Sequence, residues 1–285
     1  MTQNSNNIFD RDLLRLRRNR SANDWDNYNF LKREAVERLA DCLADIARTF
    51  DLGLDIGSHK SELAEILRGK NQVKSIISCD FSEAMKPQVV CDEEFLPFAP
   101  DIFDVITSVL SLHHVNDLPG TLVQIQQCLK SDGLFIAILP GANTLKELRE
   151  SITGAAIKHG FALSPRLSPL VEVRDAGALL QRTGFALPVI NSETITVNYD
   201  NAFALMKDLR GMGESNVLLK QHRYFTPREV MSAIAEYYHE HFGLPDGSVP
   251  ATFEFITMTG WKPHHSQQQA AERGTGKINL KQALE

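Results

Sequence analysis

The stretch that most constrains the fold of this chain lies at positions 51–67 and reads DLGLDIGSHKSELAEIL. Its apolar residues alternate in the first half, which is typical of a strand, and recur at helical spacing in the second half. Between the two halves stands Asp55-Ile56-Gly57. Glycine lets a backbone approach a ligand closely, and the N-terminus of a helix attracts negative charge. The pattern therefore predicts a strand, a tight turn and a helix that together hold a nucleotide-type ligand.

Further apolar runs at 73–79, 89–91, 103–110 and 134–139 are predicted strands, and helical spacing recurs between them, notably at 118–129. Strands that alternate with helices predict an α/β fold with a mostly parallel sheet and right-handed crossovers. Residues 21–29 are expected to be a loop, Ser131-Asp132-Gly133 a turn, and 185–199 a segment with β-rich pieces. A final run at 252–261 is expected to add an antiparallel strand. Ligands of such sheets bind beyond the carboxyl ends of the parallel strands.

Acidic residues stand at several of these strand ends. Asp80 follows the second strand, at a distance where a carboxylate accepts both ribose hydroxyls; alternatively it starts a turn with Ser82. Asp92 and Glu93 follow the third strand, where they are expected to bind an adenine amino group or to form a solvated acidic turn. The predicted cofactor-binding residues are Asp55, Gly57, Ser58, His59, Asp80, Phe81, Asp92, Glu93 and Leu110.

The chain is expected to divide into four parts. Residues 1–29 form a basic arm, which is either packed with solvated arginines or acts as a lid or docking arm for an acidic partner. Residues 30–140 form the ligand-binding core. Residues 141–263 complete the same domain and carry a helical insertion on the substrate side, and 264–285 form a polar tail.

Composition excludes several classes of function. The chain has 285 residues and a net charge of −6, which argues against nucleic-acid binding because no chain-wide excess of cations exists to displace counterions. No apolar run reaches the length of a membrane span, about 18 residues or more. The four cysteines form no CxxC pair, which favours a reducing compartment. We expect the cytoplasm in a bacterium, or the mitochondrial matrix in a eukaryote.

The turn resembles the first motif of class I S-adenosylmethionine (SAM)-dependent methyltransferases, in which an acidic residue precedes three alternating glycines. The whole chain resembles the methyltransferase-fold assembly factors of respiratory complex I, a family with a mitochondrial member implicated in hydroxylating an arginine of a complex I subunit. The segments that carry this resemblance are IFDRDL (8–13), DEEFLPF (92–98), SVLSLHHVNDLP (108–119), LRGMGESN (209–216), DGSVPAT (246–252) and AERG (271–274). A more distant resemblance is to the malonyl-carrier-protein O-methyltransferase of biotin synthesis.

The resemblance implies a Rossmann-like, seven-stranded class I methyltransferase fold, SAM as cofactor and a protein substrate such as a complex I subunit. It implies SAM contacts at Asp55, Gly57, Asp80 and the Asp92-Glu93 turn. The chain departs from the motif because His59 and Ser61 stand where the second and third glycines would be. A Cβ strains positive φ, and overpacking alone costs about 1–3 kcal/mol. Weak or lost SAM binding is therefore expected, unless the loop refolds and one of these side chains supplies a hydrogen bond.

Candidates for catalysis are His113, His114 and Glu214. An imidazole titrates near neutral pH and suits proton abstraction, although one histidine could instead pack and the other be solvated. An iron site of His113, His114 and Asp117 is set aside because adjacent histidines in a strand point to opposite faces, and no metal is predicted. Three hypotheses stay open: a SAM-dependent methyltransferase, an arginine hydroxylase of a complex I subunit, or a non-catalytic assembly protein with a degraded SAM site.

Overall fold

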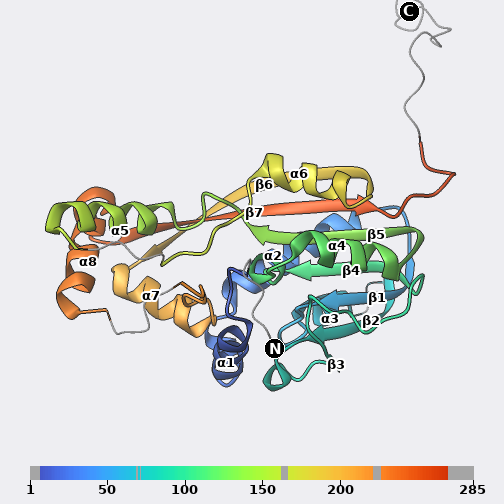
Figure 1. The fold of residues 1–285 in the computed structure, drawn as a ribbon, viewed down its shortest axis with the longest axis horizontal. Helices are drawn as coiled ribbons and strands as arrows, with labels where there is room; N and C mark the ends of the chain where they lie inside the picture. The colour runs from blue at the N-terminus through green and yellow to red at the C-terminus, as the bar shows by residue number, and fades with distance from the viewer. Residues whose placement is uncertain (1–6, 69, 71, 162–165, 221–225, 269–285) are drawn as a thin grey trace, which may run out of the picture.

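The computed structural model describes residues 7–68, 70, 72–161, 166–220 and 226–268. These residues form a seven-stranded sheet with the strand order β3-β2-β1-β4-β5-β7-β6 (Figure 1). The strands are β1 (Phe50–Ile56), β2 (Val73–Asp80), β3 (Val89–Val90), β4 (Phe103–Val109), β5 (Leu129–Pro140), β6 (Ala186–Tyr199) and β7 (Val249–Trp261). Strands β1 to β5 pair in parallel, and β7 is antiparallel to both β5 and β6. The predicted fold class, with its antiparallel last strand, is confirmed.

The α-helices are α1 (Arg11–Ser21), α2 (Phe30–Ala44), α3 (Glu62–Leu67), α4 (Leu118–Cys128), α5 (Lys146–His159), α6 (Val173–Arg182), α7 (Ala202–Gly211) and α8 (Arg228–Phe242). Short 3-10 helices are η1 (Trp25–Asn27), η2 (Glu83–Met85) and η3 (Leu112–His114). Within the described residues, no helix is long and apolar enough to cross a bilayer.

Helices cover both faces of the sheet because successive strand residues point to opposite sides. Val105 of β4 packs in one core with α2 and α3, whereas its neighbour Ile106 packs in another with α4 and α6. Both side chains are fully buried. The continuous apolar sequence of β4 follows from this two-sided burial, as in other central parallel strands.

Two further units lie at the carboxyl ends of the parallel strands (Figure 1). Strands β6 and β7 stay paired past the end of β5, from Pro140↔Phe255 out to Tyr199↔Val249, and α5, α7 and α8 pack on this extension around Tyr238 and Phe253. The second unit is α1. Asp10 caps it by accepting a hydrogen bond from the Leu13 N–H.

Several boundaries differ from the sequence-based expectation. The segment at 131–133, expected to be a turn, lies inside β5, and the fragments expected within 185–199 form the single strand β6. The expected loop at 21–29 contains η1. The AERG motif and most of the expected polar tail, residues 269–285, lie outside the described residues.

Candidate functional site

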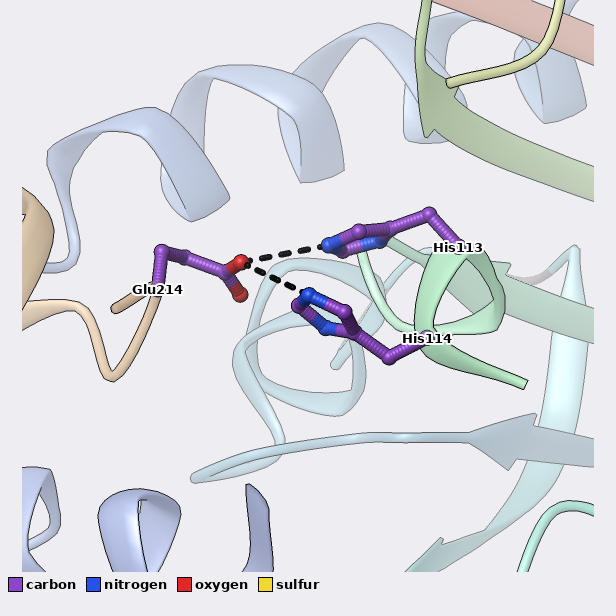
Figure 2. A group of neighbouring side chains, drawn as sticks. All are labelled: His113, His114 and Glu214. Carbon is purple, nitrogen blue, oxygen red and sulfur yellow. Dashed lines mark hydrogen bonds and ion pairs between the residues drawn. The ribbon is translucent and has the colours of Figure 1, made fainter. Parts of the chain in front are cut away.

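Two histidines and a glutamate converge beyond the end of β4 (Figure 2). His113 Nε2 lies 3.2 Å and His114 Nε2 lies 3.6 Å from the same oxygen, Oε2 of Glu214. The neighbouring histidines reach one point because they lie in the 3-10 helix η3 and not in a strand. The geometric reason for setting a two-histidine site aside was therefore wrong. The third residue of that set, Asp117, does not take part: it caps α4 by accepting from the Gly120 N–H.

Burial and charge fix the protonation of this cluster. Burial lowers the pKa of His114 to about 3, so its imidazole is neutral at physiological pH. Burial would raise the pKa of Glu214, but the neighbouring His114 and His113 outweigh it and bring the pKa to about 2. The cluster therefore presents a carboxylate next to a neutral imidazole.

The cluster lines a cavity between the sheet edge and the helical unit of α5, α7 and α8. Aromatic side chains from the N-terminal region, Trp25 and Tyr28, form part of its wall. Of the residues singled out from the sequence, the wall contains His59, Leu110, His113, His114 and Glu214. It does not contain Asp55, Gly57, Asp80 or Glu93.

The turn after β1 keeps a glycine-like backbone without all of its glycines. Gly57 has φ +65°, and a Cβ there would overlap the Ser111 side chain. His59 and Ser61 have φ of 50° and 67°, in the left-handed region that side chains rarely adopt. The His59 ring stacks on Trp25 with centroids 4.6 Å apart, and its Nδ1–H donates to the Gly57 carbonyl at 2.8 Å. The imidazole is thus fixed beside the turn, with one edge on the cavity wall.

The Arg18 guanidinium of α1 forms ion pairs with Asp80 and Glu93, the two carboxylates that were expected to bind ribose and adenine. Its Nη1 is 3.3 Å from Oδ2 of Asp80 and 3.3 Å from Oε1 of Glu93. All three side chains are buried, and Ser111 completes the group by donating to Glu93 at 2.8 Å. Asp80 also accepts from the backbone N–H groups of His59 and Ser82. This network leaves the Asp80 carboxylate no free face within the described residues.

Arg11, about two turns earlier on the same face of α1, contacts the acidic turn after β3. Its Nη2 donates to Asp92 at 2.6 Å and also to Glu93. Burial would raise the pKa of Glu93, but Arg11 and Arg18 outweigh it and keep the pKa below its usual value. The guanidinium of Arg11 lies 4.7 Å and that of Arg18 4.5 Å from the ring centre of Phe81. Phe81, expected at the cofactor, is therefore covered by the arm.

Asp55 and Ser58, two further residues expected at the cofactor, are buried in the protein interior. Asp55 Oδ1 accepts from Thr107 at 3.0 Å, while Oδ2 has no hydrogen-bond partner among the described residues. Burial raises the pKa of Asp55 to about 6. Ser58 donates its backbone N–H to Cys79, and Leu110 donates its backbone N–H to Ile138. Both backbone donors are thus used inside the protein.

Sequence reasoning missed the residues that the N-terminal region contributes. Arg18, Trp25 and Lys32 are all buried at the site, and the Lys32 ammonium donates to the carbonyls of Gly57 and Val109. The basic arm was noticed, but charge runs are usually solvated, and nothing local marks which arginine is buried. Trp25 stood in a segment expected to be a loop, although a lone tryptophan between polar residues was a signal for burial.

The fold implies SAM, and the residues at its site do not fit SAM while α1 is in place. Asp80 and Glu93, the carboxylates expected to bind ribose and adenine, are paired with the Arg18 guanidinium. A ribose hydroxyl could approach Asp80 only if this buried ion pair opened. The basic arm is therefore packed on the domain with Arg18 buried and not solvated. It also covers the acidic residues at the strand ends.

Comparison with known proteins shows which proteins this chain resembles. The family model described as "Methyltransferase domain" matches residues 28–188. The chain is 40% identical to "Arginine-hydroxylase NDUFAF5, mitochondrial" of Danio rerio, covering 96% of this chain and 88% of that protein. It is 28% identical to a malonyl-[acyl-carrier protein] O-methyltransferase of Gallionella capsiferriformans, covering 90% of this chain and 92% of that protein.

Among solved structures, a Bacillus halodurans protein described as a methyltransferase superimposes with a TM-score of 0.57 at 16% identity. The match covers 81% of this chain and all of that one. At this identity the likeness concerns the fold alone.

Proposed function

Because this chain belongs to the methyltransferase-domain family, and within it to the family of the mitochondrial arginine hydroxylases compared above, we propose that it hydroxylates an arginine side chain of a protein. One observation carries the proposal: similarity to the Danio rerio arginine hydroxylase runs through 96% of the chain at 40% identity. The malonyl-[acyl-carrier protein] O-methyltransferase also aligns over 90% of the chain, but at the lower identity of 28%.

The cavity supports this choice in two ways. Trp25 and Tyr28 contribute aromatic side chains to its wall, and aromatic surroundings suit a guanidinium. Methyl transfer, in contrast, would need SAM at carboxylates that Arg18 and Arg11 hold. Hydroxylation requires dioxygen and an external two-electron reductant. One oxygen atom enters the arginine C–H bond and the other leaves as water.

The family resemblance names the substrate class, a subunit of respiratory complex I, and we carry it over as part of the proposal. The place of action would then be the cytoplasm of a bacterium or the mitochondrial matrix of a eukaryote, where complex I is assembled.

The test compares complex I subunits from a strain that lacks the protein with those from the complemented strain. Hydroxylation adds about 16 Da to one arginine-containing peptide, and methylation adds about 14 Da. We expect the heavier product only in the complemented strain. A gain of about 14 Da would replace the proposal with methyl transfer. If every subunit had the same mass in both strains, neither reaction would stand, and a binding role in assembly would be left.

A second candidate is SAM-dependent methyl transfer. It is favoured by the placement of Asp55, Gly57, Asp80 and Glu93 at the carboxyl edge of the parallel strands, where the register of β1, β2 and β4 brings them together. Calorimetry with SAM at millimolar concentration tests it. Absence of heat and of a thermal shift would remove this candidate and leave the hydroxylase proposal untouched.

A further inference from the structure

We propose that His113, His114 and Glu214 bind one divalent transition-metal ion at the cavity wall, and that this ion is Fe(II) in the working enzyme. The site itself rests on the geometry of the three side chains. Its part in hydroxylation rests on the function proposed above.

The spacing of the three ligand atoms suits a metal ion. Metal–nitrogen and metal–oxygen bonds of about 2.1 Å place neighbouring ligand atoms about 3.0 Å apart in octahedral and about 3.4 Å apart in tetrahedral coordination. The Glu214 oxygen lies 3.2 Å from the nitrogen of His113 and 3.6 Å from that of His114. One ligand atom from each residue lies within 4.8 Å of the other two. An ion could therefore enter with small side-chain rotations and no change in the backbone.

The surrounding structure holds the ligands in this arrangement. The edge of the Phe9 ring packs against the His114 ring, with centroids 5.4 Å apart and planes nearly perpendicular. The His113 and His114 rings lie against each other at 4.0 Å. Glu214 follows Gly213, whose φ of +81° turns the chain, and its backbone N–H donates to the Leu209 carbonyl at 2.8 Å. Ligands fixed from two separate elements before binding lose little freedom when an ion arrives.

The side of the cluster away from the protein interior faces the cavity. All three ligand residues are on its wall together with Trp25 and Tyr28. Three protein ligands with further positions open is the arrangement of catalytic metal sites. Two histidines and one carboxylate are the ligands of non-haem Fe(II) oxygenases, and the open positions of such a site are where dioxygen and substrate meet.

A plain ion pair between Glu214 and the histidines is the competing explanation, and metal titration separates the two. The chain offers a matched control, because His264 and His265 form a second adjacent pair with rings 4.0 Å apart near the protein surface. The probe is Co²⁺ added to metal-free full-length protein, followed by visible absorption and calorimetry, with Fe²⁺ competition under anaerobic conditions.

We expect one Co²⁺ ion per chain at the cluster, released by Fe²⁺. Glu214→Gln and His114→Gln should each weaken binding about tenfold or more, and the double variant His264→Ala/His265→Ala should leave it unchanged. Thermal melting of every variant without metal checks that it is folded. If Glu214→Gln does not fold, Glu214→Asp, which keeps the charge and shortens the reach, must weaken binding without abolishing it.

The proposal is overturned if folded wild-type protein binds no Co²⁺, or if binding disappears in the His264/His265 variant and survives in Glu214→Gln. The outcome is independent of the hydroxylase proposal. Metal bound at the cluster in a protein that leaves every arginine unmodified would contradict only the function. Arginine hydroxylation that proceeds unchanged in Glu214→Gln would contradict only the metal site.

Discussion

His59 and Ser61 stand where the SAM motif has glycines, yet the turn after β1 has a glycine-like backbone at both positions. Both adopt left-handed backbone angles, which cost a non-glycine residue about 1 kcal/mol or more each. The strain is held by buried contacts, since His59 stacks on Trp25 and donates to the Gly57 carbonyl. The turn therefore depends on its neighbours for a conformation that glycines would adopt freely.

Gly57 cannot be replaced in the same way. We expect Gly57→Ala to lower the free energy of unfolding by about 1–3 kcal/mol more than Gly160→Ala does, because its new Cβ would overlap Ser111. Gly160 is a matched control: its φ is +68° against +65° for Gly57, and nothing lies within 4 Å of a Cβ built there. Urea unfolding of both variants measures the difference. Equal losses would show that backbone strain, and not the close approach, makes Gly57 necessary.

Asp55 gives the stability of the protein a dependence on pH. Its pKa is raised from 3.8 to about 6 by burial, so between these values the native state holds a proton that the unfolded state has released. Stability from this group is therefore fully present below pH 3.8 and is lost as the pH rises through about 6. The loss amounts to roughly 3 kcal/mol.

Asp55→Asn removes that titration. The free energy of unfolding of the variant, relative to the wild type at each pH, should increase by roughly 1–3 kcal/mol between pH 4 and pH 8. The comparison uses the change with pH, so a constant cost of the amide cancels. Denaturant titrations across this range provide the measurement. A difference that stays flat, or that falls with pH, would contradict the raised pKa.

At the scale of elements, α1 covers the acidic residues at the sheet edge where a ligand is expected. The helix places Arg18 on Asp80 and Glu93, and Arg11 on Asp92 and Glu93, so the acidic strand ends are paired inside the chain. A buried carboxylate is costly when its partner is removed, about 3–5 kcal/mol for a fully buried pair. The arm is therefore a structural clamp, and we expect it to hinder SAM at these carboxylates.

Arg18→Gln should separate these two roles. We expect the variant to be less stable by about 3 kcal/mol, because the buried Asp80 carboxylate loses its cation and Glu93 keeps only Arg11, and to bind SAM more tightly than the wild type. Arg20→Gln is the control on the same helix, because the Arg20 side chain is exposed. Thermal melting and calorimetry with SAM follow the two effects. If SAM binds the wild type and Arg18→Gln equally, Arg18 does not block the cofactor position.

At the scale of the whole molecule, the extended part of β6 and β7 carries a helical unit with its own small core. Tyr238 of α8 is fully buried in it and donates its hydroxyl to the Pro250 carbonyl at 2.7 Å. Helices α5 and α8 approach closely at Gly154, where a Cβ would overlap the ring of Tyr237. The position of this unit sets the far wall of the cavity, so its packing bears on the site.

Two helix glycines test this packing against ordinary helix propensity. Gly154→Ala should destabilise the protein by about 1–3 kcal/mol, since either the Tyr237 ring must be displaced or α5 and α8 must move apart. Gly177→Ala in α6 should stabilise it by about 1 kcal/mol, because its Cβ would lie at an ordinary 3.5 Å from Ile190. Thermal or urea unfolding of the two variants gives both signs. Stabilisation by Gly154→Ala would mean that the two helices are not in close contact.

The sequence by itself determined the layered sheet and the edge at which its polar residues gather. Alternating apolar strands and helical spacing are local patterns, and parallel strands bring their carboxyl ends to one side by geometry alone. Asp55, Gly57, Asp80 and Glu93 were therefore found without the structure. The wrong extent of β5 came from reading Ser131-Asp132-Gly133 as a turn, although the segment continues inside the strand with Asp132 at φ +63°.

Only the tertiary structure decided what faces those strand ends. Arg18 and Trp25 come from a segment whose local pattern does not show which side chain is buried, and their partners lie far along the chain. His113 and His114 converge because they lie in the 3-10 helix η3 and not in a strand, and Glu214 meets them across about 100 residues of sequence. Contacts between distant segments depend on how whole elements pack, and no local periodicity records them.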